Sequence, residues 1–370
     1  MKKKVLLFAC IEKNMGDDLF ISLICNRYPN TKFVISSEAE YGDLKNIDNL
    51  EFNNFLKKWI WASEIKGNNF FKKFIGLLLL KYYDIRLGKF DIAVHIVGNA
   101  FKNNNYKGWN DSKWIRNRLK KVKEYYLLST NFGPYNDEQW KKDFEVIYPN
   151  LKDICFRDKE SYRLFKNLEN VRYAPDTVIS LGRLEKKMKK EKRIIISTID
   201  CSLPERQGKL ENATKTYEEL MSKIIDDLYY KGYKITILNS NVEQDEKATK
   251  RIINMCKEKD FIEVFNYNGN INEVHELYQQ STAVIATRLH AIILAWLYNI
   301  KVVPIVYDVK VSNILNSYGF DNKYYNINLL EKVTTDMLIK DIEAYDYRIS
   351  DELISKAQDQ FYLLDKILKI

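Results

Sequence analysis

The sequence predicts an α/β protein with two parallel sheets, and three observations support this fold class. The chain has 370 residues, which exceeds one ordinary core and suits two α/β domains. Short apolar runs alternate with amphipathic or polar stretches, a pattern typical of βαβ units. A basic stretch at 183–192 interrupts the alternation, which then starts again. We therefore expect one βαβ domain at 1–182 and another at 193–345, with the basic stretch as their linker.

The first half contains five runs with the composition of buried strands. They lie at residues 5–10, 32–36, 92–97, 125–129 and 154–156. Four stretches between them carry helical signals, at 17–28, 112–122, 137–147 and 158–165. Several of these open on an Asp or Ser that can cap a helix, and Asp17 is the expected cap of the first.

The second half repeats the pattern, with strands expected at 193–198, 233–238, 261–264, 283–286 and 302–306. Apolar residues at helical spacing follow the first of these strands, from Tyr217 to Leu228. Thr216 and Glu219 match a capping box, and Gly232 is placed to end this helix. The last segment, 346–370, carries an apolar stripe with which it could pack back on the first domain.

Composition narrows the class of protein. The chain has 59 basic and 50 acidic residues, but no zinc finger or RNA-binding aromatic signature accompanies the lysines, so we expect no nucleic-acid partner. No apolar run approaches the roughly 20 residues of a membrane span, and the N-terminal run lacks a cleavage site for export. We therefore expect a cytoplasmic protein whose five cysteines stay reduced.

Polar clusters follow several of the expected strands. Open α/β sheets bind ligands at the carboxyl ends of their strands, so these clusters are the candidate site. They are Asn14-Met15-Gly16-Asp17, Gly98-Asn99, Asn131-Phe132-Gly133-Pro134, Arg157-Asp158, Thr287-Arg288-Leu289-His290 and Tyr307-Asp308. No His, Cys, Asp or Glu group has the spacing of metal ligands, so we expect no required metal.

The cluster around Arg288 and His290 carries the strongest chemical signal. It stands between a buried strand and a buried helix, where a helix N-terminus favours anions. Arg288 could form a forked bond to phosphate or carboxylate, and His290 could move a proton near neutral pH. The structural alternative is a histidine that caps its own helix beside an arginine paired with a core carboxylate.

Four further positions have both a functional and a structural interpretation. Arg157 could bind an anion or simply begin a helix beside a capping Asp158. Gly16 suits close approach of a ligand or a plain turn. Asp176 could serve as a base or as a turn residue, and Lys310 could reach an anionic substrate or remain solvated. The sequence lacks the G-x-G-x-x-G, Walker and G-x-S-x-G motifs.

In this order, the clusters resemble the polysaccharide pyruvyl transferase family over roughly residues 5 to 320. The residues that carry the resemblance are Met15-Gly16-Asp17, Asn131-Phe132-Gly133-Pro134, Arg157-Asp158-Lys159-Glu160-Ser161, Ala174-Pro175-Asp176, Arg288-Leu289-His290-Ala291 and Tyr307-Asp308-Val309-Lys310-Val311. The resemblance implies two Rossmann-like domains in a GT-B-like arrangement that face an interdomain cleft. One departure is Gly98-Asn99, where the family often has a glycine pair, so the acceptor side could differ.

The resemblance also implies a function for individual residues. Phosphoenolpyruvate would be the donor co-substrate, with no cofactor, and a saccharide, free or lipid-linked, would be the acceptor. The implied donor-binding residues are Arg288, Arg157, Lys310 and Leu289, and the acceptor-binding residues are Asn14, Gly16, Asn99 and Asn131. His290 would act as the acid, and Asp176 or Asp17 would accept a proton from the sugar.

Two other functions remain open at this stage. A GT-B glycosyltransferase would also bind an anionic donor, in its case a nucleotide sugar. A non-catalytic saccharide-binding protein could keep the same fold. The aromatic and basic stretch from Phe70 to Tyr83 also suggests peripheral contact with an anionic membrane, at the inner face of the cell membrane. Its alternative is a core helix with lysines on its wet side.

Overall fold

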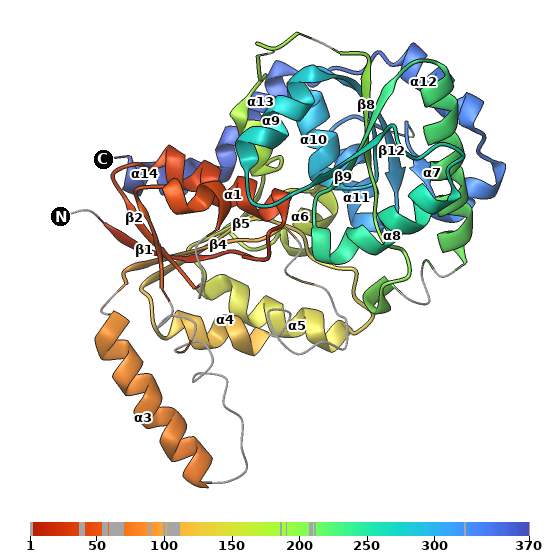
Figure 1. Ribbon diagram of the computed structural model, residues 1–370. Coiled ribbons are helices and arrows are strands. Elements are labelled where there is room, and N and C mark those ends of the chain that lie inside the picture. The colour runs from red at the N-terminus through yellow and green to blue at the C-terminus, as the bar shows by residue number, and fades with distance from the viewer. Residues whose placement is uncertain are drawn as a thin grey trace. The chain divides into compact units, whose positions relative to one another are not determined.

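The computed structural model describes residues 3–36, 41–53, 58, 70–87, 90–98, 101, 112–185, 187–189, 191–206, 210, 212–321 and 323–369. The chain divides into two units, each built on its own sheet (Figure 1). The first unit comprises Met1–Ile11, Leu19–Thr177 and Gln358–Ile370. The second comprises Glu12–Asp18 and Val178–Ala357. The long central segment of the first unit therefore ends at Thr177, whereas the sequence predicted that the first domain ends at residue 182.

The first unit contains a seven-stranded parallel sheet in the order β3-β2-β1-β4-β5-β6-β7. The strands are β1 (Lys4–Phe8), β2 (Lys32–Ile35), β3 (Leu50–Phe52), β4 (Ile92–Ile96), β5 (Glu124–Thr130), β6 (Asp153–Phe156) and β7 (Val171–Tyr173). All five strands expected in this half are confirmed. Edge strand β3 was not expected because three residues are too short for a recognisable period.

The helices of this half are α1 (Met15–Arg27), α3 (Phe70–Leu87), α4 (Ser112–Leu119), α5 (Glu138–Ile147) and α6 (Lys159–Phe165). The capping of α1 differs from expectation. The side-chain oxygen of Asn14 accepts the Gly16 N–H at 3.1 Å, so Asn14 caps the helix, and Asp17 lies inside the first turn. Asp158 caps α6 as expected, because its carboxylate accepts the Ser161 N–H.

The second unit contains a six-stranded parallel sheet in the order β10-β9-β8-β11-β12-β13. The strands are β8 (Arg193–Ser197), β9 (Lys234–Asn239), β10 (Ile262–Asn266), β11 (Ser281–Ala286), β12 (Lys301–Val306) and β13 (Tyr325–Asn326). This is the doubly wound order of a Rossmann-like domain, and its direction of winding reverses between β8 and β11. Ligands of such sheets bind beyond the carboxyl ends of the strands at that reversal.

The helices of the second unit are α7 (Ala213–Tyr230), α8 (Val242–Met255), α9 (Ile271–Gln280), α10 (Leu289–Leu297), α11 (Val309–Ser317), α12 (Thr335–Ala344) and α13 (Asp351–Ala357). The expected capping box was wrong, because α7 begins one turn earlier and Thr216 lies inside it. Gly232 does end this helix, with a φ of +76°. The basic stretch is hydrogen-bonded within the second unit, for example from Glu191 N–H to the Gln280 carbonyl.

Among the described residues, no helix is both long and apolar enough to cross a bilayer.

The C-terminal segment, with α14 (Tyr362–Leu368), belongs to the first unit. The Asp365 carboxylate accepts from Arg27 Nε at 2.8 Å, Arg27 Nη2 at 2.6 Å and the Tyr28 hydroxyl at 2.8 Å. Burial alone would raise the pKa of Asp365, but the hydrogen bonds from Arg27, Tyr28 and Lys369 outweigh it and lower this pKa. The ionised carboxylate therefore stabilises the attachment of α14.

We predict that Asp365→Asn loosens this segment by about 1–2 kcal/mol, because it removes charge-assisted hydrogen bonds. Amide exchange over Gln358–Leu368 should then accelerate roughly 5- to 30-fold near neutral pH. Since the pKa is lowered in the folded state, the wild type should lose this protection as the pH falls below about 4, and the variant should not. Asp359→Asn, an exposed carboxylate in the same segment, is the control. Equal exchange in both variants would contradict the role of Asp365.

Candidate functional site

The segment that begins α10 is held firmly at the carboxyl end of β11. The Thr287 N–H donates to the Ser197 carbonyl at 2.9 Å, which ties β11 to β8 beyond the last strand residues. The Thr287 hydroxyl lies 2.9 Å from the buried Tyr217 hydroxyl. Arg288 follows in extended conformation at the N-cap position of α10, so its side chain leaves the sheet at the reversal between β8 and β11.

Arg288 is paired with the first turn of α8. Its Nε donates to Asp245 Oδ2 at 3.1 Å, its Nη2 also donates to Asp245 Oδ1, and Nη2 donates to Gln244 Oε1 at 3.1 Å. Asp245 is fully buried, whereas 15% of the Arg288 side chain stays exposed. Burial acts to lower the pKa of Arg288, but Asp245 and Tyr307 outweigh it and raise this pKa. The guanidinium therefore remains cationic and fixed in orientation.

Arg206 is the functional candidate that the sequence reasoning missed. Its Nη2 donates to Gln244 Oε1 at 3.2 Å, so Arg206 and Arg288 share one oxygen. Its Nη1 donates to the Asp200 carbonyl at 2.5 Å, and its guanidinium lies 5.3 Å from the centroid of the Tyr307 ring. It stands nine residues beyond β8, in the short turn Pro204–Arg206, so a search for residues directly after strands does not reach it.

Lys310 completes a group of three cations, which we call the cation cluster: Arg206, Arg288 and Lys310. The Lys310 ammonium lies 5.9 Å from the centroid of the Tyr307 ring and 3.6 Å from Asp308 Oδ2. Asp308 also caps α11 through the Lys310 N–H. Three cations therefore gather in the second unit beyond β8, β11 and β12, which is an arrangement suited to an anion that carries more than one charge.

His290 and Gly16 lie against each other in the second unit. A Cβ atom on Gly16 would fall 2.0 Å from His290 Nδ1, so only glycine leaves room for the imidazole. The segment of Gly16 is anchored there by the Met15 N–H, which donates to the Ser240 carbonyl at 3.0 Å, and by a bridge between Asn14 and Asn241. Of the expected acceptor residues, Gly16 is thus brought to His290, and Asn14 to Asn241.

Two carboxylates follow Gly16 on α1. Asp17 is half-buried in the first turn. The next residue, Asp18, is fully buried and accepts from the Tyr267 hydroxyl at 2.7 Å, a contact that the sequence did not reveal. Leu289, an expected donor residue, is nearly buried as the first residue of α10. Asn99 lies outside the described residues.

Arg157 sits in a closed network of the first unit. Its Nε donates to Asn131 Oδ1 at 2.6 Å, its Nη1 to Asp176 Oδ2 at 2.7 Å and its Nη2 to the Gly98 carbonyl at 2.7 Å. Only 3% of its side chain is exposed, and Asp176 is fully buried. A Cβ atom on Gly98 would lie 2.8 Å from both Nη atoms of Arg157, so a larger residue at this position would collide with the guanidinium. Arg157 thus ties together the carboxyl ends of β4, β5, β6 and β7.

The network brings together three expected site residues, Asn131, Arg157 and Asp176. Their side chains form hydrogen bonds with one another. Asp158 closes it, accepting from Asn131 Nδ2 and from the Ser161 hydroxyl. The structure gives these residues a structural role, and their roles toward donor, acceptor or proton stay predictions.

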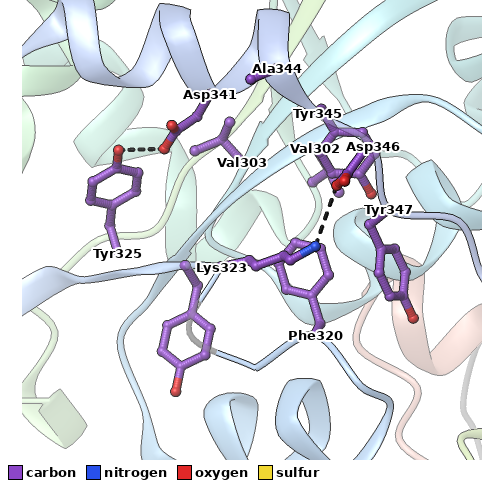
Figure 2. A pocket seen from close by; sticks show the side chains of 11 residues that line it. Val302, Val303, Phe320, Lys323, Tyr325, Asp341, Ala344, Tyr345, Asp346 and Tyr347 are labelled. Atoms are coloured by element: carbon purple, nitrogen blue, oxygen red, sulfur yellow. Dashed lines mark hydrogen bonds and ion pairs between the residues drawn. The ribbon is translucent and has the colours of Figure 1, made fainter.

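The second unit also contains a pocket of about 390 Å³. Figure 2 shows its lining, in which the Tyr325 hydroxyl meets Asp341 and Lys323 meets Asp346. Val302 and Val303 lie in the first half of β12, whereas Tyr307 follows the end of that strand. The pocket therefore contains none of the expected site residues.

We predict that Gly16→Ala destabilises the second unit by about 1–3 kcal/mol, because its methyl group would overlap His290. In a His290→Ala background the same change should cost little, since the imidazole is gone. A double-mutant cycle on the midpoint of urea unfolding measures the difference. An equal cost in both backgrounds would show that the imidazole does not fill this space.

For the first unit, Asp176→Ala should cost about 3–5 kcal/mol, because it leaves the buried Arg157 charge without its ionic partner. The matched control is Asp351→Ala, which removes the partner of Arg183 from an ion pair whose side chains are mostly exposed. That change should cost at most about 1 kcal/mol. Thermal unfolding of the variants provides the comparison, and similar midpoints for both would refute the structural role of Asp176.

Comparison with known proteins supports the fold and identifies the family. The UDP-GlcNAc 2-epimerase of Methanocaldococcus jannaschii, solved with UDP-GlcNAc and UDP, is 10% identical; the similarity covers 99% of this chain and 100% of that one, with a TM-score of 0.58. TarM is 11% identical over 100% of this chain and 98% of its own, with a TM-score of 0.53. These similarities concern the fold alone, and they confirm the GT-B-like α/β class.

A relative at the sequence level is the amylovoran biosynthesis protein AmsJ of Erwinia amylovora. The two are 19% identical over 331 residues, which cover 82% of this chain and 79% of AmsJ. The model of the polysaccharide pyruvyl transferase family matches residues 14–309, a span that contains every expected site residue except Lys310. This chain belongs to the polysaccharide pyruvyl transferase family.

Proposed function

We propose that the protein transfers the pyruvyl group of phosphoenolpyruvate to a sugar of a bacterial surface polysaccharide or its lipid-linked precursor. The product is a pyruvate ketal, and phosphate is released. The observation that carries this proposal is the cation cluster beside Tyr307 and beyond the strand ends β8, β11 and β12. Membership in the polysaccharide pyruvyl transferase family supports this interpretation of the cluster.

The donor has two anionic groups, a phosphate and a carboxylate, and the cation cluster offers charge for both. An arginine whose orientation is fixed binds such groups through a forked pair of hydrogen bonds. Arg288 is fixed by Asp245 and Gln244, and Arg206 by Gln244 and the Asp200 carbonyl. Lys310 adds a third positive charge. Its ammonium is carried on a flexible side chain, so it can stay close to the phosphate as the phosphate leaves.

The chemistry begins with proton transfer. His290 donates a proton to the methylene carbon of phosphoenolpyruvate, and a sugar hydroxyl adds to the neighbouring carbon as it becomes cationic. That hydroxyl gives its proton to a carboxylate. The C–O bond to phosphate then breaks, and the carboxylate passes its proton to the departing phosphate. A second hydroxyl of the sugar adds to close the ketal and gives its proton to the imidazole of His290, which restores the acid.

Asp17 and Asp176 are the two candidates for the carboxylate base. Asp176 is fully buried and occupied by Arg157, whereas Asp17 is half-buried beside Gly16, the residue that contacts His290. Asp17 therefore fits the role better.

The test is phosphate release and mass spectrometry of candidate sugars incubated with phosphoenolpyruvate. His290→Ala should lower kcat by about 10²–10⁴, the usual contribution of general acid catalysis. Arg206→Ala and Arg288→Ala should each raise the KM for phosphoenolpyruvate about tenfold or more, as expected when a charged contact is lost. Arg163→Ala, an exposed arginine on α6, is the control and should change neither constant. An unchanged kcat in His290→Ala together with an unchanged KM for phosphoenolpyruvate in Arg288→Ala would overturn the proposal.

A GT-B glycosyltransferase is the second candidate, because the cation cluster would also suit the diphosphate of a nucleotide sugar. Release of a nucleoside diphosphate from a sugar nucleotide, without phosphate from phosphoenolpyruvate, would favour it. Acceptor binding that is equally tight in His290→Ala, with no turnover of either donor, would instead indicate a non-catalytic saccharide-binding protein.

The acceptor would be a sugar of a capsule or exopolysaccharide, assembled in the cytoplasm at the inner face of the cell membrane. A lipid-linked acceptor requires the enzyme to work close to that surface.

A further inference from the structure

Helix α3 (Phe70–Leu87, orange in Figure 1) exposes large apolar side chains along its length. Six of them are between 40% and 75% exposed: Phe74, Ile75, Leu77, Leu78, Tyr82 and Ile85. They recur at intervals of three and four residues, so they share one face of the helix. Lys81, also exposed, lies on the same face.

On another side of α3, Gly76 is buried and Leu79 is half-buried. The exposed apolar face is not what a core helix would show, and a core helix was the alternative open from the sequence. A contiguous apolar face of this size is rare on a soluble monomer and marks a surface that something else covers.

Charge indicates what covers this face. Between residues 57 and 86 the sequence has seven basic residues and two acidic ones, so over half of the net charge of +9 falls in this short stretch. Basic residues with Phe and Leu are the composition of helices that lie in the boundary of anionic lipids.

The helix is suited to lying on a bilayer rather than crossing it. Its 18 residues would span only about 27 Å, less than the roughly 30 Å of a hydrocarbon core. Five of them are charged, namely Lys72, Lys73, Lys81, Asp84 and Arg86.

We propose that α3 docks on an anionic lipid bilayer, with the apolar face from Phe74 to Ile85 entering the boundary between headgroups and acyl chains. The docking itself rests on α3 alone. Its use, to bring the enzyme to a lipid-linked acceptor, rests on the proposed function.

The test is sedimentation of the full-length protein with phosphatidylcholine vesicles that contain or lack phosphatidylglycerol. The wild type should bind the anionic vesicles, and Leu77→Glu with Ile85→Glu should lower the partition coefficient at least roughly tenfold. The matched control is Val146→Glu on α5, because Val146 and Leu77 are 66% and 65% exposed. It should bind as the wild type does. Lys81→Gln should weaken binding to anionic vesicles only.

The Arg288→Ala variant should bind vesicles as the wild type does, because α3 is unchanged in it. A failure of the proposed donor chemistry can therefore be distinguished from a failure of membrane docking. The proposal is overturned if the wild type ignores both kinds of vesicle, or if the double-glutamate variant binds as well as the wild type. A third outcome would also overturn it. In that outcome the wild type forms a dimer through α3 in the absence of lipid and does not bind vesicles, and the double-glutamate variant is a monomer. Circular dichroism establishes that each variant is folded.

Discussion

The ion pair between Arg288 and Asp245 is the interaction on which the second unit's candidate site depends. Asp245 belongs to α8, which follows β9, while Arg288 follows β11, so the pair joins the two halves of the sheet across the reversal between β8 and β11. Such a reversal otherwise leaves a crevice between helices that diverge. The pair keeps the crevice from widening there and holds a guanidinium at its edge. Gln244, beside Asp245 on α8, accepts from both Arg288 and Arg206 at this edge.

Arg157 and Arg288 both closely follow a strand in the sequence, but the structure gives them different surroundings. Arg157 is almost fully buried, and its Nε and both Nη atoms donate to protein groups of the first unit. Moving it toward a ligand would break its ion pair with the fully buried Asp176, which costs several kcal/mol. Arg288 also has a buried carboxylate partner, but it keeps part of its side chain exposed and has further cations beside it. Position after a strand therefore predicts where an arginine lies, and burial decides what it can still bind.

Most of the fold could be predicted from the sequence, because strands buried on both faces are continuous apolar runs. The short edge strands β3 and β13 could not, since two or three residues show no period. The site was predictable where its residues directly follow strands, as with Arg288 and His290. It was not predictable for Arg206, which a loop brings back to the strand ends. The contact of Gly16 with His290 likewise depends on residues 12–18 packing in the second unit, a tertiary fact with no local signal.

The cation cluster gathers three positive charges at one place in the second unit. Arg206 and Arg288 donate to the same Gln244 oxygen, so their positive charges lie close together, and Lys310 faces the same Tyr307 ring as Arg206. Asp245 and Asp308 compensate two of the three charges, and the Tyr307 ring offers only a weak attraction. An anionic ligand bound there would be attracted by all three cations. For the proposed donor, the same three cations would also stabilise the phosphate that leaves.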